Sequence, residues 1–338
     1  MQLTAEQILG MTARDAAALF PGDNKTMKRG FAKLVAKWHP DVCSDPRAED
    51  VFTHILSLRD RVSGQSRKSV SQRVLKTADG KALGIAPLST HAVDQGEILV
   101  GKRTISTLFT KALSDLAQRE AGASTAFRFA GETMRDQMRP FLPHIIESKA
   151  MEGGSTLVIT KKDPEEILLA DLLASRGAMP DVHAAWLCSG LLNIAAWMEF
   201  SQLVHGAIAP ETVLIDPAKH SVRLASGWAF VTKRAERPIA LPGRTLSLVP
   251  RMAIKGQPAE SRMDLDLIRQ TVRDALGDPR GTAGGVASLP TQVGSWLAMP
   301  PAETAVEDYA AWQRALESGW GKRRFVDYPV RAADIYAR

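Results

Sequence analysis

Residues 205–230 read HGAIAPETVLIDPAKHSVRLASGWAF, and apolar residues alternate on both sides of the central DPAKH turn. This alternation with a period of two predicts a pair of short antiparallel strands joined by the turn. The preceding residues 182–203 have the strongest helical periodicity in the chain. Their shared apolar face consists of Trp186, Leu187, Leu191, Ile194, Ala195 and Met198. A long helix, a loop and a strand pair are therefore expected in succession.

The chain upstream of this stretch mixes strand and helix patterns. The predicted strands are residues 76–83 with a DG turn at 79–80, residues 97–100, residues 104–109 and residues 156–160. The predicted helices are residues 113–129 and residues 167–174. The C-terminal third is helical with proline-rich joints. Together these patterns predict a domain of the α+β class.

A different pattern occupies residues 24–40, NKTMKRGFAKLVAKWHP, near the N-terminus. The block has no acid, and its basic residues are Lys25, Lys28, Arg29, Lys33 and Lys37. Its apolar residues Met27, Phe31, Leu34, Val35 and Trp38 recur at helical spacing. The pattern predicts one amphipathic helix with a basic outer face. The helix ends at His39-Pro40-Asp41, because proline lacks a backbone donor and disfavours helix in the residue before it.

Two further helices accompany this one. The first covers residues 13–20, and the second begins near residue 47, with Val51, Phe52, Ile55, Leu58 and Val62 on its apolar side. A polar, serine-rich stretch follows at residues 63–73, SGQSRKSVSQR, which is typical of a linker. We therefore expect a helical domain at residues 1–65, a linker at 66–75, an α+β domain at 76–280 and a helical extension at 281–338.

Composition limits the classes of protein to consider. The 338 residues are ordinary for a globular chain of more than one domain, and the net charge is +6. No run approaches the roughly 18 apolar residues of a membrane span. The N-terminus lacks the basic start and apolar run of a secretory signal, so we expect a cytoplasmic protein. Cys43 and Cys188 have no CxxC or histidine-rich neighbourhood, which argues against a disulfide framework or a zinc site.

The stretch KRGFAKLVAKWHPDV, followed by AEDVFTHILSLRDRV, resembles the J-domain of DnaJ-type co-chaperones over about residues 10–65. Positions on both helices fit, not the HPD tripeptide alone. The resemblance implies an all-α helical hairpin in which His39, Pro40 and Asp41 bind the heat-shock chaperone DnaK and stimulate its ATP hydrolysis. The basic face with Arg29, Lys33 and Lys37 would join this contact, since a dense positive stripe steers a domain onto an acidic partner.

The larger part of the chain, about residues 70–280, resembles the protein-kinase fold. The resemblance rests mainly on residues 204–215, VHGAIAPETVLI, at the place of the catalytic loop, and on residues 222–228, VRLASGW, at the place of the metal-binding segment. It implies that Glu120 stands where a glutamate normally pairs with a strand lysine. It also implies that Asp264 belongs to a buried helix of the large lobe.

The groups that phosphoryl transfer needs are missing at these positions. The reaction needs a carboxylate that orients the attacking hydroxyl, side chains that hold magnesium, and a lysine on the phosphates. The corresponding positions hold Ala207 for the catalytic Asp, Ala209 for its neighbouring Lys, Thr212 for the metal-binding Asn and Ser226 for the metal-binding Asp. Residues 104–109 contain no lysine, and the glycines of residues 83–96, LGIAPLSTHAVDQG, are too far apart to cover phosphates. We therefore expect a pseudokinase, not an enzyme, with no metal and no cofactor.

Structural roles are the simplest explanation for several single residues. His205 is expected to pack and form hydrogen bonds rather than act as an acid or base. Asp264 and Asp266 lie two apart at the start of a predicted helix. They either cap that helix or hold the catalytic-type loop by hydrogen bonds.

The combined expectation is a co-chaperone whose J-domain stimulates DnaK and whose pseudokinase domain binds an unknown client. An atypical kinase or nucleotide-binding regulator with relocated catalytic groups is the first alternative. A basic adaptor for nucleic acid is the second. The nucleic-acid hypothesis is disfavoured because Phe31 and Trp38 fall on the apolar face of the basic helix, not among its charges.

Overall fold

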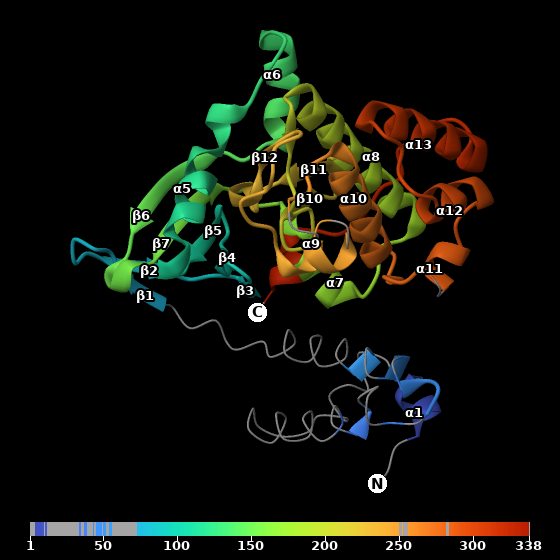
Figure 1. The fold of residues 1–338 in the computed structure, drawn as a ribbon, viewed down its shortest axis with the longest axis horizontal. Coiled ribbons are helices and arrows are strands. Elements are labelled where there is room, and N and C mark those ends of the chain that lie inside the picture. Colours follow the sequence, from blue (N-terminus) through green and yellow to red (C-terminus); the bar gives the residue numbers. More distant parts are fainter. Residues whose placement is uncertain are drawn as a thin grey trace. The chain divides into compact units, whose positions relative to one another are not determined.

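The computed structural model describes residues 4–9, 11, 34, 37–38, 43, 45–48, 50–51, 54–55, 73–249, 252, 256–281 and 284–337. The chain divides into two compact units, Met1–Ser69 and Val70–Arg338. Figure 1 shows that the second unit holds all the labelled strands and every labelled helix except α1.

The described part of the first unit has a small apolar core of its own. Helix α1 (Ala5–Leu9) begins with a reciprocal cap, because the Thr4 hydroxyl accepts from the Gln7 N–H at 3.3 Å and the Gln7 side chain accepts from the Thr4 N–H at 2.9 Å. The buried core residues are Ala5, Ile8, Trp38, Val51 and Ile55. The last three occupy positions that the helical spacing assigns to apolar faces.

One helix of this unit was not predicted, and two predicted features fall on residues that the structure does not describe. Helix α1 was not predicted, because five residues are too short to display a periodicity. The predicted helix over residues 13–20 and the His39-Pro40-Asp41 tripeptide lie outside the described residues.

The second unit is built on a five-stranded antiparallel sheet with the order β3-β4-β5-β7-β6. Its strands are β3 (Ser89–Val93), β4 (Gly96–Val100), β5 (Thr104–Phe109), β6 (Ile145–Ala150) and β7 (Thr156–Lys161). Between β5 and β6 the chain forms α5 (Ser114–Gly122) and α6 (Glu132–Met138), with 3-10 turns η1 (Lys111–Leu113), η2 (Ala123–Ala126) and η3 (Arg139–Phe141). Because the strand order ends with β6, this strand lies at one edge of the sheet. Helix α6 projects beyond the sheet (Figure 1).

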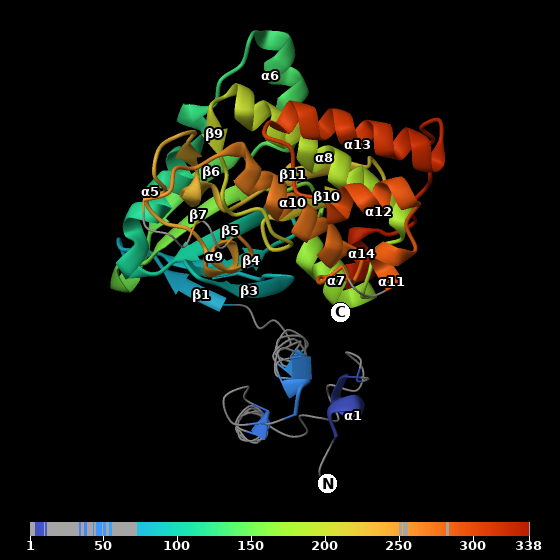
Figure 2. The ribbon, with the colours of Figure 1, turned by 45° about the vertical axis from the view of Figure 1, so that its right-hand side comes forward.

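The helical part of this unit follows the sheet in the chain. Its helices are α7 (Leu169–Arg176), α8 (Asp181–Phe200), α9 (Gly243–Leu248), α10 (Ser261–Ala275), α11 (Gly284–Ala287), α12 (Thr291–Ala298), α13 (Ala305–Trp320) and α14 (Ala332–Tyr336). Its short strands are β8 (Ile167–Leu168), β9 (Leu203–Val204), β10 (Val213–Asp216), β11 (Ser221–Leu224) and β12 (Thr232–Lys233). Figure 2 shows the five-stranded sheet on one side of the unit and helices α8, α10, α12 and α13 on the other.

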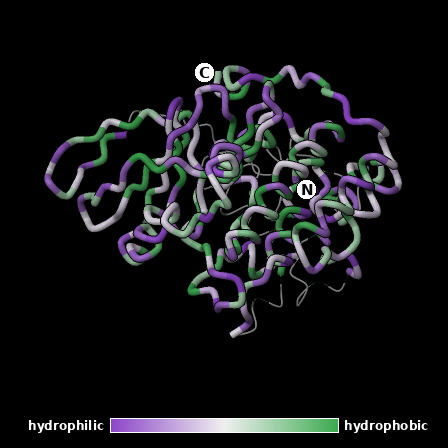
Figure 3. The backbone as a smooth tube through the Cα atoms, turned by 90° about the horizontal axis from the view of Figure 1, so that it is seen from above, coloured by the Kyte–Doolittle hydropathy of each residue, from purple (hydrophilic) through white to green (hydrophobic). Residues whose placement is uncertain are grey.

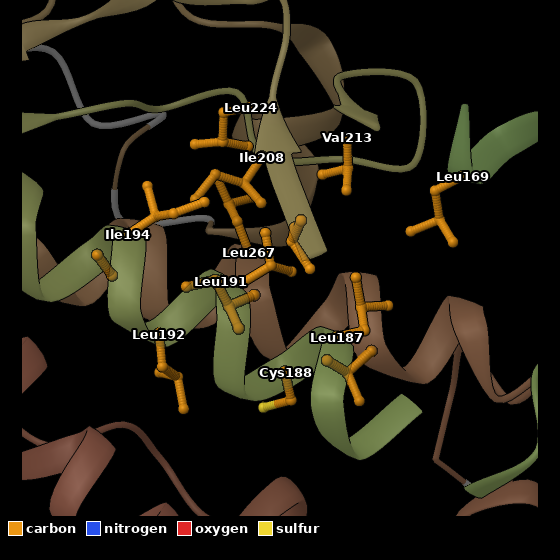
Figure 4. Close-up of a cluster of buried hydrophobic side chains, with 14 of the residues drawn as sticks. Leu169, Leu187, Cys188, Leu191, Leu192, Ile194, Ile208, Val213, Leu224 and Leu267 are labelled. Atoms are coloured by element: carbon orange, nitrogen blue, oxygen red, sulfur yellow. The ribbon is translucent and has the colours of Figure 1, made fainter. Parts of the chain in front are cut away.

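Helix α8 is the centre of the main core because it is apolar on most of its circumference. Leu187, Leu191 and Ile194 are fully buried. In Figure 4 these side chains lie beside Ile208, Val213 and Leu224 of the following loop and strands, and beside Leu267 of α10. Figure 3 shows hydrophobic stretches of the tube gathered in the interior of this unit. The burial of this apolar area is the main source of stability.

A buried ion pair joins α13 to α10. The Arg269 guanidinium donates to both carboxylate oxygens of Asp308, at 2.6 and 2.8 Å, and both side chains are 3% exposed. The guanidinium also lies 3.8 Å from the centroid of the Trp296 ring. A bidentate, stacked arginine fixes the orientation of the two helices.

The observed elements differ from the predicted ones at several places. The predicted helix over residues 113–129 is α5 followed by the 3-10 turn η2, which ends at Ala126, and α6 was not predicted. Residues 167–168, predicted as the start of a helix, form β8.

Strand β1 (Arg73–Lys76) begins inside the predicted linker at residues 66–75 and pairs with β2 (Ala82–Ile85) across the DG turn. Strand β3 lies within residues 83–96, where no strand was predicted, because Thr90 and Val93 pair with β4 only in the tertiary structure. Strand β6 was also missed, since its exposed polar residues hide the alternation.

Two further findings concern membrane-spanning helices and the cysteines. None of the helices in the described ranges has the length and apolar character that crossing a bilayer requires. Cys43 and Cys188 are both free thiols, the first half-buried and the second buried.

Candidate functional site

The loop after β9 is held by one carboxylate of α10. Asp264 accepts the backbone N–H of His205 at 2.7 Å and that of Gly206 at 2.8 Å, through separate oxygens. The Thr245 hydroxyl of α9 donates to the Gly206 carbonyl at 2.7 Å. Both sides of the peptide at Gly206 are thus tied to helices, so the loop has one defined conformation.

At the other end of the loop, the Thr212 side chain forms hydrogen bonds with backbone groups of the loop itself. Its hydroxyl accepts the N–H of Ala209 at 3.0 Å and donates toward the Ala207 carbonyl at 2.9 Å. Ala207, Ala209 and Thr212 are all buried. The loop therefore presents no ionisable side chain to solvent at the three positions that the kinase resemblance assigns to catalysis.

His205 is a neutral, structural histidine. It is fully buried, its Nδ1 accepts the Ala207 N–H at 3.3 Å, and its ring packs edge-on against Trp228 with the centroids 4.8 Å apart. Burial lowers the pKa of His205 to about 3, because the charged imidazolium would lose its hydration. At neutral pH the ring is therefore uncharged, with Nδ1 as the acceptor and its single proton on Nε2, and it holds no imidazolium proton to give as a general acid.

The segment after β11 closes against this loop through a glycine. Gly227 has φ +84°, and a Cβ there would lie 3.1 Å from each of Ala207 Cβ, His205 Cε1 and Thr212 Cγ2. Only glycine combines that conformation with so close an approach. Ser226, just before it, is 2% exposed. The structure thus brings the segment of Ser226 and Gly227 close to His205, Ala207 and Thr212.

Glu120 of α5 also reaches this segment. Its Oε2 accepts the Ala229 N–H at 2.6 Å, and its side chain is 2% exposed. Burial raises the pKa of Glu120 to about 7, although the backbone N–H groups of Ala229, Gly227 and Trp228 favour its anion. The neighbouring Arg119 donates to the Ala229 carbonyl at 2.8 Å. Glu120 therefore pairs with backbone rather than with a lysine.

The chemistry that these groups allow is limited. Glu120 and Asp264 are the buried carboxylates in contact with the two segments, and both are used in hydrogen bonds to backbone N–H groups. Burial raises the pKa of Asp264 to about 6 as well. Within the described ranges, no three His, Cys, Asp or Glu side chains are placed to hold a metal ion. Lys102 and Lys111, which flank β5, are exposed.

A buried apolar cluster packs the five-stranded sheet against the helical part of the second unit. We use "seam" for the buried cluster of Ile98, Val100, Ile105, Leu168, Leu214 and Ala225. The first three residues belong to β4 and β5 of the sheet. Leu168 belongs to β8, Leu214 belongs to β10, and Ala225 directly follows β11. Ala225 adjoins Ser226, so the seam borders the site just described. Tyr336 of α14 packs against the seam.

Polar contacts fasten Tyr336 beside the seam. Its hydroxyl accepts the Leu168 N–H at 3.0 Å and donates to Asp171 of α7 at 2.8 Å. Asp171 also accepts from the Ser89 hydroxyl at 2.6 Å and lies 2.9 Å from His91 Nε2, both on β3. Burial opposes the charge of His91, but the hydrogen bond and negative charge of Asp171 outweigh it, so the pKa of His91 is raised.

This polar cluster was missed by sequence reasoning. Ser89, His91, Asp171 and Tyr336 are separated by up to 247 positions of numbering, and no local pattern marks them. The nearest signal is that Asp171 falls in the first turn of α7, where acids are ordinary. Only the tertiary fold places them together.

A buried lysine borders the same region. Lys162 is 1% exposed, and its Nζ donates to the Asp163 carbonyl at 3.2 Å and lies 5.6 Å from the Tyr336 ring centroid. Burial lowers the pKa of Lys162, while the charges of Glu166 and Asp163 oppose that shift. Lys162 follows β7, so it is not a substitute for a lysine on β5.

The structure describes one of the predicted chaperone-binding residues. Arg29, Lys33, His39, Pro40 and Asp41 lie outside the described residues. Lys37 is described, and its Nζ lies 5.1 Å from the ring centroid of Trp38.

Comparison with known proteins was made for the whole chain. No protein-family model matches it, and no curated protein matches it. A solved structure of vaccinia related kinase 3 is similar, with 14% identity and a TM-score of 0.46 over 76% of this chain and 93% of that one. A likeness at this TM-score carries no argument about this chain.

Proposed function

We propose that the second unit is a kinase-like scaffold that does not transfer phosphate, and that the first unit is a J-domain-type module that acts on DnaK. The protein would then recruit the chaperone to a partner bound by the scaffold. The two parts of this proposal rest on different observations and have separate tests.

The observation that carries the scaffold proposal is the Asp264-held loop with alanine at its reactive position. In protein kinases the catalytic loop supplies an Asp for the substrate hydroxyl and an Asn for magnesium. Here Asp264 holds the loop through the backbone N–H groups of His205 and Gly206, but Ala207 and Thr212 stand at those positions. The geometry of a catalytic loop without its reactive groups supports a binding role.

The kinase-like assignment draws further support from the order of contacts. The third strand of the five-stranded sheet, β5, leads to α5, whose Glu120 contacts the segment that follows β11. In kinases a glutamate of the helix after the lysine-bearing strand is part of the phosphate site. Glu120 keeps that place, but its partner is the Ala229 N–H.

The packing of Tyr336 argues further against nucleotide binding. A nucleotide held near Ser226 would have to lie between β4 or β5 and the segments around the loop, where the seam is already packed and Tyr336 lies against it. The first alternative, an atypical kinase or nucleotide-binding regulator, requires that space to open.

Thermal unfolding of the full chain with and without magnesium-ATP tests the scaffold proposal. We expect the same midpoint in both, with magnesium alone as the control. A ligand at a hundred times its dissociation constant stabilises the native state by about 2.7 kcal/mol, so binding would raise the midpoint by several degrees. Such a rise would favour the nucleotide-binding alternative and contradict the scaffold.

The J-domain part of the proposal is supported by the sequence and by the core of the first unit. Trp38, Val51 and Ile55 are buried together, so the end of the basic helix and the second predicted helix share one core. That arrangement is compatible with a helical hairpin around the HPD tripeptide. A dense positive stripe on such a small domain is suited to docking onto an acidic partner.

Single-turnover ATP hydrolysis by a bacterial DnaK tests this part. We expect stimulation by the full chain and its loss in His39→Gln, because the imidazole of the HPD tripeptide would no longer contact the chaperone. His144→Gln makes the same replacement at an exposed histidine of the second unit and should leave stimulation unchanged. Equal stimulation by wild type and His39→Gln would contradict the proposal.

A further inference from the structure

The edge strand β6 borders a wide groove. The groove encloses about 1060 Å³ and is lined by β6, by the end of α6 and the turn after it, and by the segment that follows β7. None of the loop residues from His205 to Thr212 lines it. We call it the β6 groove. It is separate from the seam and from the Asp264-held loop.

Strand β6 is incompletely covered. Its residues Ile146, Glu147 and Ser148 are exposed in succession, whereas β5 and β7 are buried along most of their length. Ile146 is 53% exposed, and it lies at the point where the register with β7 shifts. An apolar side chain at the bulged edge of a sheet is available to a partner.

The outer edge of β6 offers backbone groups as well. Over the described residues, β7 is the one strand that pairs with β6, and Ala150 at its far end accepts from the Ala78 N–H at 2.9 Å. No other backbone bond from outside the sheet reaches residues 145–149 within the described chain. Alternate N–H and C=O groups of an edge strand point outward, where an extended chain can pair with them.

The rim of the groove is positively charged. Its exposed basic residues are Arg103, Arg135, Arg139 and Lys161. Across the described part of the chain, none of these four forms a salt bridge, whereas Arg73, Arg223, Arg234, Arg244, Arg262 and Arg269 all do.

The acids that line the groove offset this charge only in part. Glu147 is paired with Lys149 at 2.5 Å, and Asp163 lies 3.7 Å from Lys219. Asp136 is the remaining acid of the lining. Four cations around one groove produce a field that attracts an anionic partner.

We propose that the β6 groove binds an acidic, extended segment of a partner protein, which adds to β6 as a strand and places its carboxylates against Arg103, Arg135, Arg139 and Lys161. The backbone pairing gives affinity, and the charges and the pocket over Ile146 give specificity. The inference deepens the proposed scaffold function by naming where a partner is taken. Its test involves neither DnaK nor nucleotide, so its failure is distinguishable from failure of that function.

Fluorescence anisotropy with the full chain tests the proposal. The probe is a labelled ten-residue peptide of alternating glutamate and valine. We expect saturable binding that Arg135→Glu combined with Arg139→Glu weakens at least tenfold. Arg176→Glu combined with Arg314→Glu changes the net charge equally at exposed arginines outside the groove and should weaken it less than threefold. Equal weakening by both pairs would overturn the groove as the site.

Two further measurements separate strand addition from simple charge attraction. The same peptide with alternate backbone nitrogens methylated loses donors but keeps its charge, and we expect at least tenfold weaker binding. Hydrogen exchange should slow at residues 145–149 when the unmodified peptide is added. Equal binding of the methylated peptide, or no added protection there, would overturn strand addition. Tighter binding of a single-stranded RNA of ten uridines would overturn the acidic-peptide assignment in favour of nucleic acid.

Discussion

The seam and the β6 groove lie in the same unit, but their polar groups are satisfied in opposite ways. Around the seam, Tyr336, Asp171, Ser89 and the Leu168 N–H satisfy one another within the chain. Around the groove, four exposed cations and the edge of β6 lack such partners among the described residues. Buried polar groups need hydrogen-bond partners within the chain, whereas exposed polar groups are hydrated and remain free to bind another molecule.

The difference favours the β6 groove, rather than the loop and the seam, as the region that binds a partner. The Asp264-held loop and the seam are buried and belong to the core of the second unit. The exposed cations around the β6 groove form no salt bridge among the described residues, and the one internal side-chain contact found for them there is that of Arg135 with the Phe129 ring, 5.6 Å from its centroid. Substitutions at the Asp264-held loop and the seam should therefore cost stability, and substitutions at the groove should cost binding alone.

The largest effect is expected for Asp264→Ala. The change leaves the N–H groups of His205 and Gly206 buried without an acceptor, and each such group costs about 1–3 kcal/mol. We expect the free energy of unfolding to fall by about 2–4 kcal/mol in urea titrations. Asp115→Ala removes an exposed acid and serves as the control. A loss below about 0.5 kcal/mol, the range of an ordinary surface change, would show that the loop is not held by Asp264.

A smaller effect is expected for Tyr336→Phe. The ring keeps its packing against the seam, but the hydroxyl that joins the Leu168 N–H to Asp171 is lost. We expect a loss of about 1 kcal/mol in the free energy of unfolding, because Tyr336 is only half-buried and water can replace part of the contact. Tyr309→Phe, in α13, is the matched control. Equal losses in both would contradict a specific role for the Tyr336 hydroxyl.

The pH dependence of stability should reveal Glu120. Its pKa is about 7 in the folded chain against an ordinary 4.5, so the folded chain holds this proton more tightly than the unfolded chain does. The resulting stabilisation is complete below pH 4.5 and is lost as the pH rises through 7, with a slope of at most about 1.4 kcal/mol per pH unit. Asp264 contributes in the same direction between its ordinary 3.8 and about 6.

Urea titrations at pH 5, 6, 7 and 8 check this expectation. Glu120→Gln should flatten the decline in stability with pH, since the amide keeps an acceptor for the Ala229 N–H but does not titrate. Glu307→Gln, at an exposed acid of α13, should leave the profile unchanged. His205, whose folded pKa of about 3 lies below its ordinary 6.5, contributes in the opposite direction, so the difference between wild type and Glu120→Gln is the test. The same pH profile in both would contradict the raised pKa of Glu120.

The smallest stability effect is expected for Arg135→Glu combined with Arg139→Glu. Both residues are exposed and have no carboxylate partner among the described residues, so the free energy of unfolding should change by less than about 0.5 kcal/mol. Thermal and urea unfolding of the variant measure this directly. A loss above 2 kcal/mol would mean that these arginines support the fold, and the contrast between seam and groove would disappear.

Local patterns in the sequence determined most of the regular elements. The alternation around the DPAKH turn predicted β10 and β11, and the apolar face of residues 182–203 predicted α8, which spans Asp181–Phe200. The absence of an acid at Ala207 and Ser226 is also a property of the sequence, because residue identity needs no fold to be read. These features depend on neighbours within a few positions, so spacing alone reveals them.

The tertiary structure alone decided the rest. The contact of Tyr336 with Asp171 joins residues 165 positions apart, and Ser89 reaches Asp171 across 82. The edge position of β6 follows from the crossing of β7 into the sheet between β5 and β6. The charge of the groove combines four cations from three segments, with Arg135 and Arg139 on one helical stretch and Arg103 and Lys161 apart from it. Such features depend on which segments meet in space, and the periodicity of a single segment carries no information about that.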